Sequence, residues 1–550
     1  MAEALSADVQ RLVVSPLEAV PSYTLGPNTE IELRNKSLLC KKASICLLRL
    51  FRTNPECVVL DEWMKRLAKL LEDRDIGVIT SILSLLLAFA SHSPAIFEPL
   101  VPYVISVLTR LVVNRTCPAD YLYYHTPSPW IQVKCLRFLQ YYKIPEDSTQ
   151  LELLNDSMNK ILNKTEMSES TNKSNADHSV LFEAINLIIS YGSDCPAHLK
   201  DHASTLLGKF ISTKDANIRY LGIEAMTKLA KLEGPQVSEH YQTDVLDSLK
   251  DPDISLRKRA LNLLYVMTYE KNAHDIVGEL VINLPSSDAQ IKEDIVVKIA
   301  ILAEKYHTDF KWYLDTMIQV ILLAGDYVAE AVWYRVIQVV INTPDIHDYA
   351  AEKLLNSVQS KFAHEIIVVL SSYLIGEIGV NICERPGMSG YDQFIALHQH
   401  FPNVSLKVQC LMLTTYMKLL NLYPDQIHDL VIDVFKKYST SSHLELQQRA
   451  WEYLTLSGMP SATIETVFNT MPPFPIDQKE NILLAMEAVE AKTADRPAWA
   501  VDQVEKEASR AALHDSKGSS EQVERSQRKP TQSVQPQVIP LLSNSHLLIT

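Results

Sequence analysis

One stretch of the chain, DISLRKRALNLLYVM at Asp253–Met267, has the spacing of a helix that packs against others of the same design. From its opening aspartate, Leu256 follows at +3, Arg257 at +4, Ala260 at +7 and Leu264 at +11, which places the apolar side chains on one helix face. The small residue at +7 allows a neighbouring helix to approach closely, and the aspartate is suited to cap the amino end of the helix. Because one such helix cannot bury its apolar face alone, the stretch predicts similar neighbours.

The same spacing recurs along most of the chain. The positions that start each match are Lys36, Asp75, Asp177, Asp215, Asp253, Asp288, Asp326, His364, Asn403 and His443. From Asp177 onward, successive starts lie 35 to 40 residues apart. A period of ~35–47 residues built from helix pairs is typical of HEAT and armadillo arrays, so the sequence predicts an all-α solenoid. In this frame Trp333 occupies the +7 position of its repeat and is expected to be buried between helices.

A longer gap interrupts the periodicity in the first half of the chain. Asp75 and Asp177 are 102 residues apart, which is more than two regular repeats. Trp130 gives a weak match to the spacing inside this gap. The polar stretch Asn163–Asp177 is expected to form an inserted loop.

Composition agrees with a helical solenoid. Only 14 of the 550 residues are glycine, which disfavours an architecture of strands and tight turns. A hydrophobic content of 47% is enough for a large core. The longest apolar run, Val78–Ala90, is too short to span a bilayer. Since no basic segment followed by an apolar stretch opens the chain, we expect no secretion signal and a cytosolic location.

Charge and cysteine content exclude several classes of protein. The formal net charge is −14, with 66 acidic against 52 basic residues, which disfavours a general nucleic-acid binder. The eight cysteines are scattered without a CxxC pair, so we expect reduced thiols rather than a metal or redox site.

The chain divides into three predicted regions. Residues 1–35 are expected to be irregular because Pro16, Pro21 and Pro27 interrupt any helix. Residues 36–492 form the predicted solenoid trunk, in which Asn481–Lys492 is expected to supply a last amphipathic helix. Residues 493–550 are rich in Ser, Gln, Glu, Lys and Pro and are expected to be disordered.

Sequence motifs for chemistry are scarce. The chain has no Walker loop, GxGxxG, GxSxG or HExxH motif. His398-Gln399-His400, with Cys410 downstream, is the nearest candidate for a metal site, but it has too few ligands to predict one. We therefore expect no catalytic, cofactor-binding or metal-binding residues and no cofactor, and the sequence does not identify the residues of a protein or lipid interface.

Two basic clusters are candidates for contact with lipid phosphate. They are Arg257-Lys258-Arg259 and Lys41-Lys42, the latter together with Arg49 and Arg52. The favoured alternative is that Arg257 satisfies a ladder of contacts between repeats and that the other side chains form a solvated face.

Several segments are closely similar to one family. These segments are KASICLLRLFRTNPE at Lys42–Glu56, SNADHSVLFEAINLII at Ser174–Ile189, YHTDFKWYLDTMIQVILLAGDYVAEAVWYRVIQVVIN at Tyr306–Asn342, ELQQRAWEYLTLS at Glu445–Ser457 and MPPFP at Met471–Pro475. They resemble the trunk of the alpha-adaptins, large subunits of the heterotetrameric clathrin adaptor of the plasma membrane. The resemblance covers roughly residues 42–480. Other adaptor large subunits share the architecture, but the stretch GDYVAEAVWYRVIQVVIN looks closest to the alpha type.

The resemblance implies a structural, non-enzymatic role in endocytosis and intracellular protein transport. A trunk of this family binds the small sigma subunit, pairs with a beta-adaptin and helps to place the medium mu subunit over cargo and membrane. It meets the clathrin coat indirectly. The implied location is the cytoplasmic face of the plasma membrane, at clathrin-coated pits, where the complex is a peripheral component. No nucleic acid is implied as a partner.

The two ends of the sequence depart from the family pattern. The family trunk begins with repeats that carry phosphoinositide-binding residues and part of the dileucine-cargo contact, and Met1–Lys41 does not resemble them. The family chain also continues to a folded appendage, which has no counterpart in this sequence. No lipid-binding or appendage residue of the family can therefore be placed on this chain.

Two other classes of function remain open from the sequence. A stand-alone solenoid scaffold or transport receptor would share the repeat but not the alpha-like segments, and a large subunit of a Golgi or endosomal adaptor would share the architecture. An enzyme would require a pocket between the repeats.

Overall fold

A computed structural model of the chain describes residues 29–58, 60, 63–164 and 170–474. Contacts divide the chain into two units, Met1–Lys492 and Thr493–Thr550, and all described residues lie in the first. The predicted helix at Asn481–Lys492 and the predicted tail at 493–550 lie outside the described residues. The division of the chain into three regions therefore stays a prediction.

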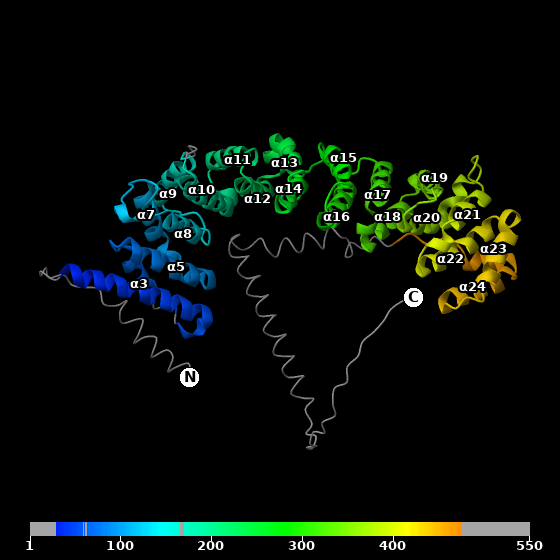
Figure 1. The fold of residues 1–550 in the computed structure, drawn as a ribbon, viewed down its shortest axis with the longest axis horizontal. Coiled ribbons are helices and arrows are strands. Elements are labelled where there is room, and N and C mark those ends of the chain that lie inside the picture. Colours follow the sequence, from blue (N-terminus) through cyan, green and yellow to red (C-terminus); the bar gives the residue numbers. More distant parts are fainter. Residues whose placement is uncertain (1–28, 59, 61–62, 165–169, 475–550) are drawn as a thin grey trace, which may run out of the picture. The chain divides into compact units, whose positions relative to one another are not determined.

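The described residues are almost entirely helical, as the sequence predicts (Figure 1). The helices of the first half are α3 (Thr29–Thr53), α4 (Met64–Leu71), α5 (Ile76–His92), α6 (Pro94–Phe97), α7 (Val101–Val112), α8 (Pro129–Leu139), α9 (Ser148–Leu162), α10 (Thr171–Tyr191), α11 (Ala197–Ile211), α12 (Ala216–Glu233), α13 (Gln242–Ser248) and α14 (Ile254–Met267). Those of the second half are α15 (Ala273–Asn283), α16 (Ala289–Lys305), α17 (Phe310–Ala324), α18 (Glu330–Asn342), α19 (His347–Val358), α20 (Glu365–Ile378), α21 (Gly390–His398), α22 (Leu406–Leu422), α23 (Pro424–Tyr438), α24 (Leu444–Ser457) and α25 (Ser461–Val467).

Short 3-10 helices and one small hairpin join these helices. The 3-10 helices are η2 (Pro55–Cys57), η4 (Glu98–Leu100), η5 (Ala119–Tyr121), η6 (Gly192–Asp194), η7 (Pro235–Tyr241), η8 (Gly325–Tyr327), η9 (Pro344–Ile346), η10 (Gly379–Ile382) and η11 (Phe401–Asn403). The hairpin pairs β1 (Leu122–Tyr123) with β2 (Thr126–Pro127) in antiparallel register, with Leu122 opposite Pro127 and Tyr123 opposite Thr126.

The helices stack in two rows, and contacts run mainly between neighbours in the chain (Figure 1). In one row α3, α5, α8, α10, α12, α14 and α16 each pack on the next, and the row continues with α18, α20, α22 and α24. The other row contains α4, α7, α9 and α11 in the first half and α15, α17, α19, α21 and α23 in the second. Each pair buries its apolar face against the pairs beside it, which makes the described chain an α-solenoid.

The spacing read from Asp253–Met267 is confirmed in the helix that it describes. Asp253 caps α14, and its carboxylate accepts the backbone N–H of Ser255 at 2.9 Å. Leu256, Ala260 and Leu264 are completely buried. Small Ala260 allows the close contact between α14 and its neighbours that the +7 position predicts.

The start positions of the other repeats agree in part. The side chains of Asp75, Asp215 and His364 also cap their helices by accepting first-turn N–H groups, while Asp288 and His443 are N-cap residues without such a bond. Four start positions are wrong: Lys36 and Asp177 lie inside α3 and α10, Asp326 lies in η8, and Asn403 lies in η11. The repeat spacing identifies which face of a helix is buried, but it does not identify the first residue of the helix. That residue depends on the conformation of the preceding turn.

Because Asp326 does not start the helix, the burial predicted for Trp333 is also wrong. Helix α18 begins at Glu330, with Ala329 as its N-cap. Trp333 is therefore only half-buried rather than enclosed between helices, and its ring stacks on that of Tyr334 with centroids 4.1 Å apart. The inward positions of α18 are taken by Val336, which is completely buried, and its apolar neighbours.

Two segments predicted to be irregular contain helix. Helix α3 begins at Thr29, inside the region 1–35, because no proline follows Pro27 to interrupt it. Helix α10 begins at Thr171, so most of the described part of Asn163–Asp177 extends that helix rather than forming a loop. Polar composition suggested a loop, but a long helix can carry a polar first turn when its later turns are buried.

Charged pairs connect successive repeats. The Arg257 guanidinium binds the carboxylate of Asp288, the start of the next repeat, at 2.5 Å, which confirms the predicted ladder contact. A similar pair joins Arg219 to Asp251, two residues before the start position Asp253. Lys41 likewise binds Asp75 at 2.8 Å. Such pairs set the register of neighbouring helices more than they add stability, since partly exposed ion pairs contribute about 0–1 kcal/mol.

The segment that follows α25 returns to earlier repeats. The backbone N–H of Met471 donates to Glu377 of α20 at 3.0 Å. Further along, Phe474 forms two hydrogen bonds with Asn342 of α18. We call residues 471–474 the return segment.

In the part of the chain that the structure describes, two helical stretches are long and apolar enough to cross a membrane, Pro94–Val112 and Glu365–Ile382. Half of the first and 67% of the second are buried among neighbouring helices. Their apolar character is that of core helices in the stack.

Candidate functional site

The histidines considered for a metal site serve separate structural contacts. His398 Nδ1 lies 3.2 Å from the Tyr416 hydroxyl, whereas His400 Nε2 lies 2.8 Å from the carbonyl oxygen of Val358. Cys410 is buried on α22. Within the described residues no three His, Cys, Asp or Glu side chains are grouped to hold a metal ion.

The basic clusters considered for lipid are engaged within the solenoid in part, since Arg257, Arg259 and Lys41 have partners, whereas Lys42, Arg49 and Arg52 are exposed. Besides the Arg257 pair, the Arg259 guanidinium donates to the Tyr220 hydroxyl at 2.9 and 3.0 Å. Lys41 is held by Asp75. Lys258 is exposed, so one cation of its cluster faces solvent.

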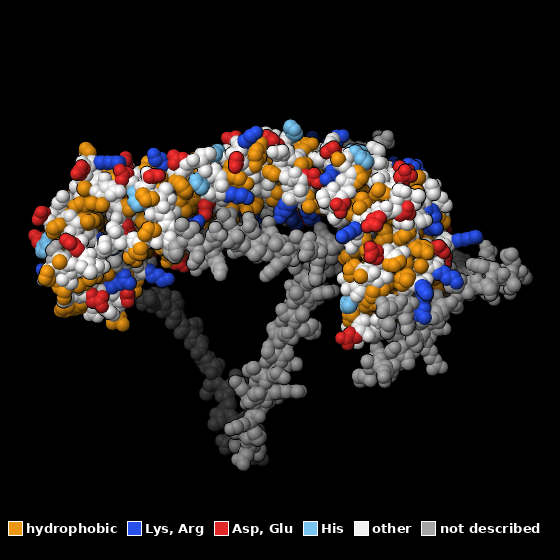
Figure 2. Space-filling model, turned by 180° about the vertical axis from the view of Figure 1, so that it is seen from behind, with side chains coloured by type: hydrophobic (Ala, Val, Ile, Leu, Met, Phe, Trp, Pro, Cys, Tyr) orange, Lys and Arg blue, Asp and Glu red, His pale blue; other side chains and the backbone are white. Residues whose placement is uncertain are grey.

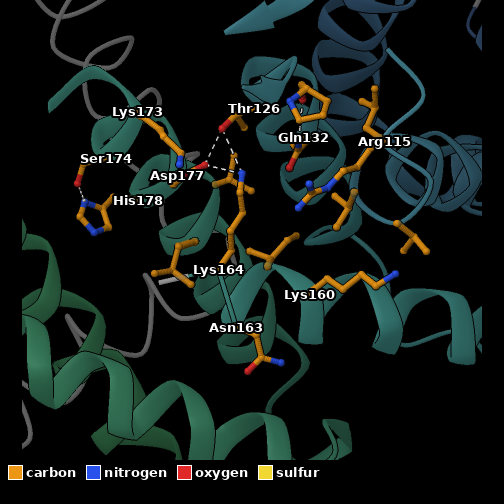
Figure 3. A pocket seen from close by; sticks show the side chains of 17 residues that line it. Arg115, Thr126, Gln132, Lys160, Asn163, Lys164, Lys173, Ser174, Asp177 and His178 are labelled. Carbon is orange, nitrogen blue, oxygen red and sulfur yellow. Dashed lines mark hydrogen bonds and ion pairs between the residues drawn. The ribbon is translucent and has the colours of Figure 1, made fainter. Parts of the chain in front are cut away.

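A pocket lies where α7, α8, α9 and α10 meet, beside the β1–β2 hairpin (Figure 3). Its volume is about 610 Å³, within the ~300–1,000 Å³ typical of small-molecule sites. Its apolar lining residues include the buried side chains of Leu111, Ile161 and Leu181. The described polar lining residues include four cations, Arg115, Lys160, Lys164 and Lys173, and one carboxylate, Asp177. We call this site the basic pocket.

The carboxylate of the basic pocket is already bound. Asp177 Oδ1 accepts hydrogen bonds from Lys164 Nζ at 2.7 Å and from the Thr126 hydroxyl at 2.8 Å, and Lys164 also lies 3.1 Å from Thr126 Oγ1 (Figure 3). The side chain of Asp177 is only 13% exposed. This network joins the hairpin to α10 and engages the one carboxylate among the described lining residues of the pocket.

The other three cations lack such a partner. No carboxylate in the described part of the chain lies within ion-pair distance of Arg115, Lys160 or Lys173. In Figure 3 the Arg115 guanidinium and the Lys164 ammonium group approach the interior from opposite sides. Among the described lining residues, cations therefore outnumber carboxylates in a protein that is acidic overall.

A histidine at the edge of the basic pocket is neutral in character. Burial lowers the pKa of His178 below its usual value, against the opposing effects of Asp177 and Asp215. Its Nδ1 lies 3.3 Å from the Ser174 hydroxyl. The positive charge of the pocket thus comes from its Lys and Arg side chains.

The connection that forms one wall has an unusual backbone. Among the described residues, the non-glycine residues with positive φ are Arg115 (49°), Tyr124 (45°), His125 (67°) and Ser128 (34°), all between α7 and α8. Non-glycine residues in this region are uncommon and tend to cluster at functional sites. Gln132 supports the connection by donating to the Pro127 carbonyl at 2.6 Å.

Sequence reasoning did not identify the basic pocket. Lys160, Lys164 and Lys173 are close in sequence, and their density was visible, but Arg115 lies 45 residues before Lys160. Only the packing of α7 beside α9 brings them together. The sequence predicts a loop for the stretch that contains both lysines, whereas Lys164 follows the end of α9 and Lys173 lies in the first turn of α10.

The two-row helical stack defines the class of protein as an α-solenoid built from helix pairs. The family model described as the adaptin N-terminal region matches residues 31–461. The chain belongs to this family.

Curated relatives are named as adaptor subunits. The chain is 40% identical over 501 residues to the AP-2 complex subunit alpha-2 of Arabidopsis thaliana, which covers 90% of this chain and 47% of the relative. It is 41% identical over 445 residues to the AP-2 complex subunit alpha-2 of Dictyostelium discoideum, covering 80% and 45%. The AP-1 complex subunit gamma of the same organism is 28% identical over 456 residues, covering 79% and 49%. The chain thus spans about half the length of these relatives.

Proposed function

We propose that this chain is the trunk of an alpha-type large subunit in a clathrin-associated adaptor complex that serves endocytosis. The supporting observation is a comparison within one organism: identity to the Dictyostelium AP-2 alpha-2 subunit is 41%, against 28% for its AP-1 gamma subunit, over similar lengths. A shared trunk architecture alone would give similar identities to both relatives. The higher identity to the alpha subunit therefore favours the alpha type.

The proposed role is structural and not enzymatic. The trunk binds the small sigma subunit, pairs with a beta-adaptin and helps to place the medium mu subunit, and it meets the clathrin coat indirectly. The complex lies on the cytoplasmic face of the plasma membrane as a peripheral component. The surface is consistent with protein partners, because apolar side chains are exposed in patches among charged ones (Figure 2). Leu444 and Trp451 on α24, for example, are 76% and 57% exposed.

Affinity purification of the tagged full chain from its own cells tests the proposal. We expect the sigma, mu and beta subunits of the plasma-membrane adaptor to be recovered, and no binding of the purified chain to nucleic acid at physiological salt. A tagged gamma-type trunk from the same cells is the control and should recover its own partners. Recovery of a Golgi or endosomal set by this chain would contradict the alpha assignment, and recovery of no adaptor subunit would favour a stand-alone scaffold.

A further inference from the structure

We propose that the return segment occupies a site that binds, in its place, an extended and proline-containing segment of a partner protein. The site consists of Asn342 on α18, Glu377 on α20 and a cavity beside Met471, and we call it the peptide site. Three observations support the inference: the contacts are made to the backbone of the return segment, its prolines keep it extended, and its side chains fill the site incompletely. None of them depends on the role proposed for the trunk as an adaptor subunit.

The peptide site binds the main chain of the return segment. The N–H of Phe474 donates to Asn342 Oδ1 at 2.9 Å, and Asn342 Nδ2 donates to the carbonyl oxygen of Phe474 at 3.1 Å. Three residues earlier, the N–H of Met471 donates to Glu377 Oε2 at 3.0 Å. Hydrogen bonds to the main chain provide affinity without selecting the side chains of a peptide. Another segment with the same extended backbone can therefore make the same contacts.

The carboxylate of the peptide site is held in place by the helices around it. The side chain of Glu377 is 5% exposed, and its Oε1 binds the ammonium group of Lys418 on α22. This ion pair leaves Oε2 for the N–H of Met471. A buried acceptor without a partner is costly, so release of the return segment favours the entry of another N–H donor.

Prolines give the return segment the conformation that the site binds. Residues 471–474 read MPPF and precede Pro475, and the described residues 469–474 form neither helix nor strand. Proline fixes its own φ and disfavours helical backbone in the residue before it, so Met471 and Phe474 are both biased toward extended conformations. Extended segments of this kind lose little conformational entropy when they bind. Proline is therefore the feature expected of a competing partner segment.

The side chains of the return segment leave room in the peptide site. Met471 is 55% exposed, and both prolines of the segment are exposed. A cavity of about 210 Å³ lies beside Met471, and its apolar lining includes Tyr373 of α20 and Leu411 of α22. A partner segment that places a larger apolar side chain in this cavity would gain contacts that Met471 does not make.

The ordinary alternative is that the return segment only caps the end of the solenoid. A cap covers the stacking face of the last helices. The return segment instead leaves α25 and reaches α18 and α20, while Leu444 and Trp451 on α24 stay exposed. Because the segment does not cover this apolar surface, its contacts favour a peptide site over a cap.

Peptide binding to the purified full chain tests the inference. The probe is a fluorescent peptide with the sequence NTMPPFPI of Asn469–Ile476, and its binding is measured by anisotropy. The released variant, Met471→Pro with Phe474→Pro, removes both N–H donors of the return segment and leaves Asn342 and Glu377 unchanged. Its control, Met471→Leu with Phe474→Leu, keeps both donors and an apolar side chain at each position.

We expect the released variant to bind the peptide about tenfold more tightly than the unchanged chain, because a tethered segment competes at a high effective concentration. The leucine control should bind the peptide as weakly as the unchanged chain does. Added to the released variant, Asn342→Ala should reduce the affinity about tenfold, whereas Asn217→Ala, at an exposed position on α12, should leave it unchanged. No binding by the released variant would overturn the inference, as would equal binding after Asn342→Ala.

Two further peptides test recognition of the main chain. A peptide with leucine in place of its methionine and phenylalanine should keep its affinity for the released variant to within about threefold, because the site binds backbone groups. A peptide with an N-methyl group on the phenylalanine nitrogen lacks the donor to Asn342 and should bind about tenfold less tightly. Equal binding of the N-methyl peptide would contradict the proposed mode of recognition.

Two measurements on the unchanged chain complete the test. An excess of the peptide should displace the return segment and accelerate hydrogen exchange at Met471 and Phe474, a result that does not depend on the fold of the proline variants. Unchanged exchange in a saturating excess would show that peptide and return segment bind different sites, and would overturn the inference. Self-association in sedimentation that Asn342→Ala abolishes would make the occupant a second copy of this chain, which would overturn the assignment to a partner protein.

Discussion

Asn342 and Phe474 exchange two hydrogen bonds, although 132 positions separate them in the sequence. The N–H of Phe474 donates to Oδ1 of Asn342 at 2.9 Å, and Nδ2 of Asn342 donates to the carbonyl oxygen of Phe474 at 3.1 Å. Asn342 is the last residue of α18, so one amide side chain satisfies both backbone groups of a residue that follows α25.

Replacement of this amide should release the return segment. Asn342→Ala removes both hydrogen bonds and should weaken the local attachment by about 1–2 kcal/mol, because the contact is partly solvated. Hydrogen exchange of the Phe474 amide, followed by mass spectrometry in a peptide that contains it, should accelerate. Asn342→Asp keeps the acceptor for the N–H group and should retain part of the protection. Unchanged exchange in Asn342→Ala would mean that the segment is held by other contacts.

A buried ion pair beside the return segment should contribute more to stability than the hydrogen bonds of Asn342. The side chains of Glu377 and Lys418 are 5% and 12% exposed and bind each other, and Glu377 also accepts the N–H of Met471. Glu377→Ala leaves the Lys418 ammonium group buried without its partner, and should cost about 3–5 kcal/mol. Thermal melting and exchange in α20 and α22 measure the loss.

The matched control removes both charges at once. Glu377→Ala combined with Lys418→Met should recover most of the lost stability, since the double variant buries no unpaired charge. A double variant as unstable as the single one would show that packing, rather than the unpaired charge, causes the loss.

Stability around α21 should fall in mild acid. Burial, with a smaller effect of Lys437, lowers the pKa of His398 below its usual 6.5. As the pH falls, His398 is therefore protonated in the unfolded chain before it is protonated in the folded chain. The contribution of neutral His398 to folding stability is complete above pH 6.5 and declines as the pH falls below it. Exchange in α21, corrected for its intrinsic pH dependence, should accelerate between about pH 6.5 and 5.

A variant without the titrating group identifies the source of this effect. His398→Gln should be less stable at neutral pH, because it disturbs the aromatic contacts with Phe394 and Phe401, yet its α21 exchange should lose the acid dependence. An acid dependence that persists unchanged in the variant would assign the effect to another group.

Substitution of a core residue should destabilise the protein more than substitution of a half-buried residue. Leu264 is completely buried, and Leu264→Ala should destabilise the neighbouring repeats by about 2–5 kcal/mol. Trp333 is half-buried against Tyr334, and Trp333→Ala should cost less, about 1–2 kcal/mol. Exchange should show both losses confined to adjacent helix pairs. A larger loss at Trp333 than at Leu264 would contradict the burial of these two side chains.

The sequence predicted helix faces better than helix ends. Leu256, Ala260 and Leu264 could be assigned to the core because helical periodicity depends on side-chain spacing alone. Asp253 and Asp326 look equally suitable as caps, yet only Asp253 caps a helix, since the 3-10 turn η8 carries Asp326 away from the start of α18. That turn packs against α16 and α17, and a local sequence pattern does not contain such tertiary contacts.

The basic pocket illustrates a different limit. The sequence shows that Lys164 and Asp177 are close along the chain. It does not show that Thr126 contacts both, because this contact depends on the hairpin that precedes α8. Arg115 joins the same site through tertiary packing. A periodic pattern shows how repeats resemble one another, whereas this pocket forms where one connection departs from the pattern.

The tie between Phe474 and Asn342 also changes how the trunk would carry mechanical load. Tension on the chain beyond Phe474 would reach α18 through two hydrogen bonds before it reached α24 or α25. The helix pairs between these points would then be shielded from the force until the tie ruptured. Extension under load would accordingly proceed in two stages, with the release of the return segment preceding the unravelling of the repeats that it bridges.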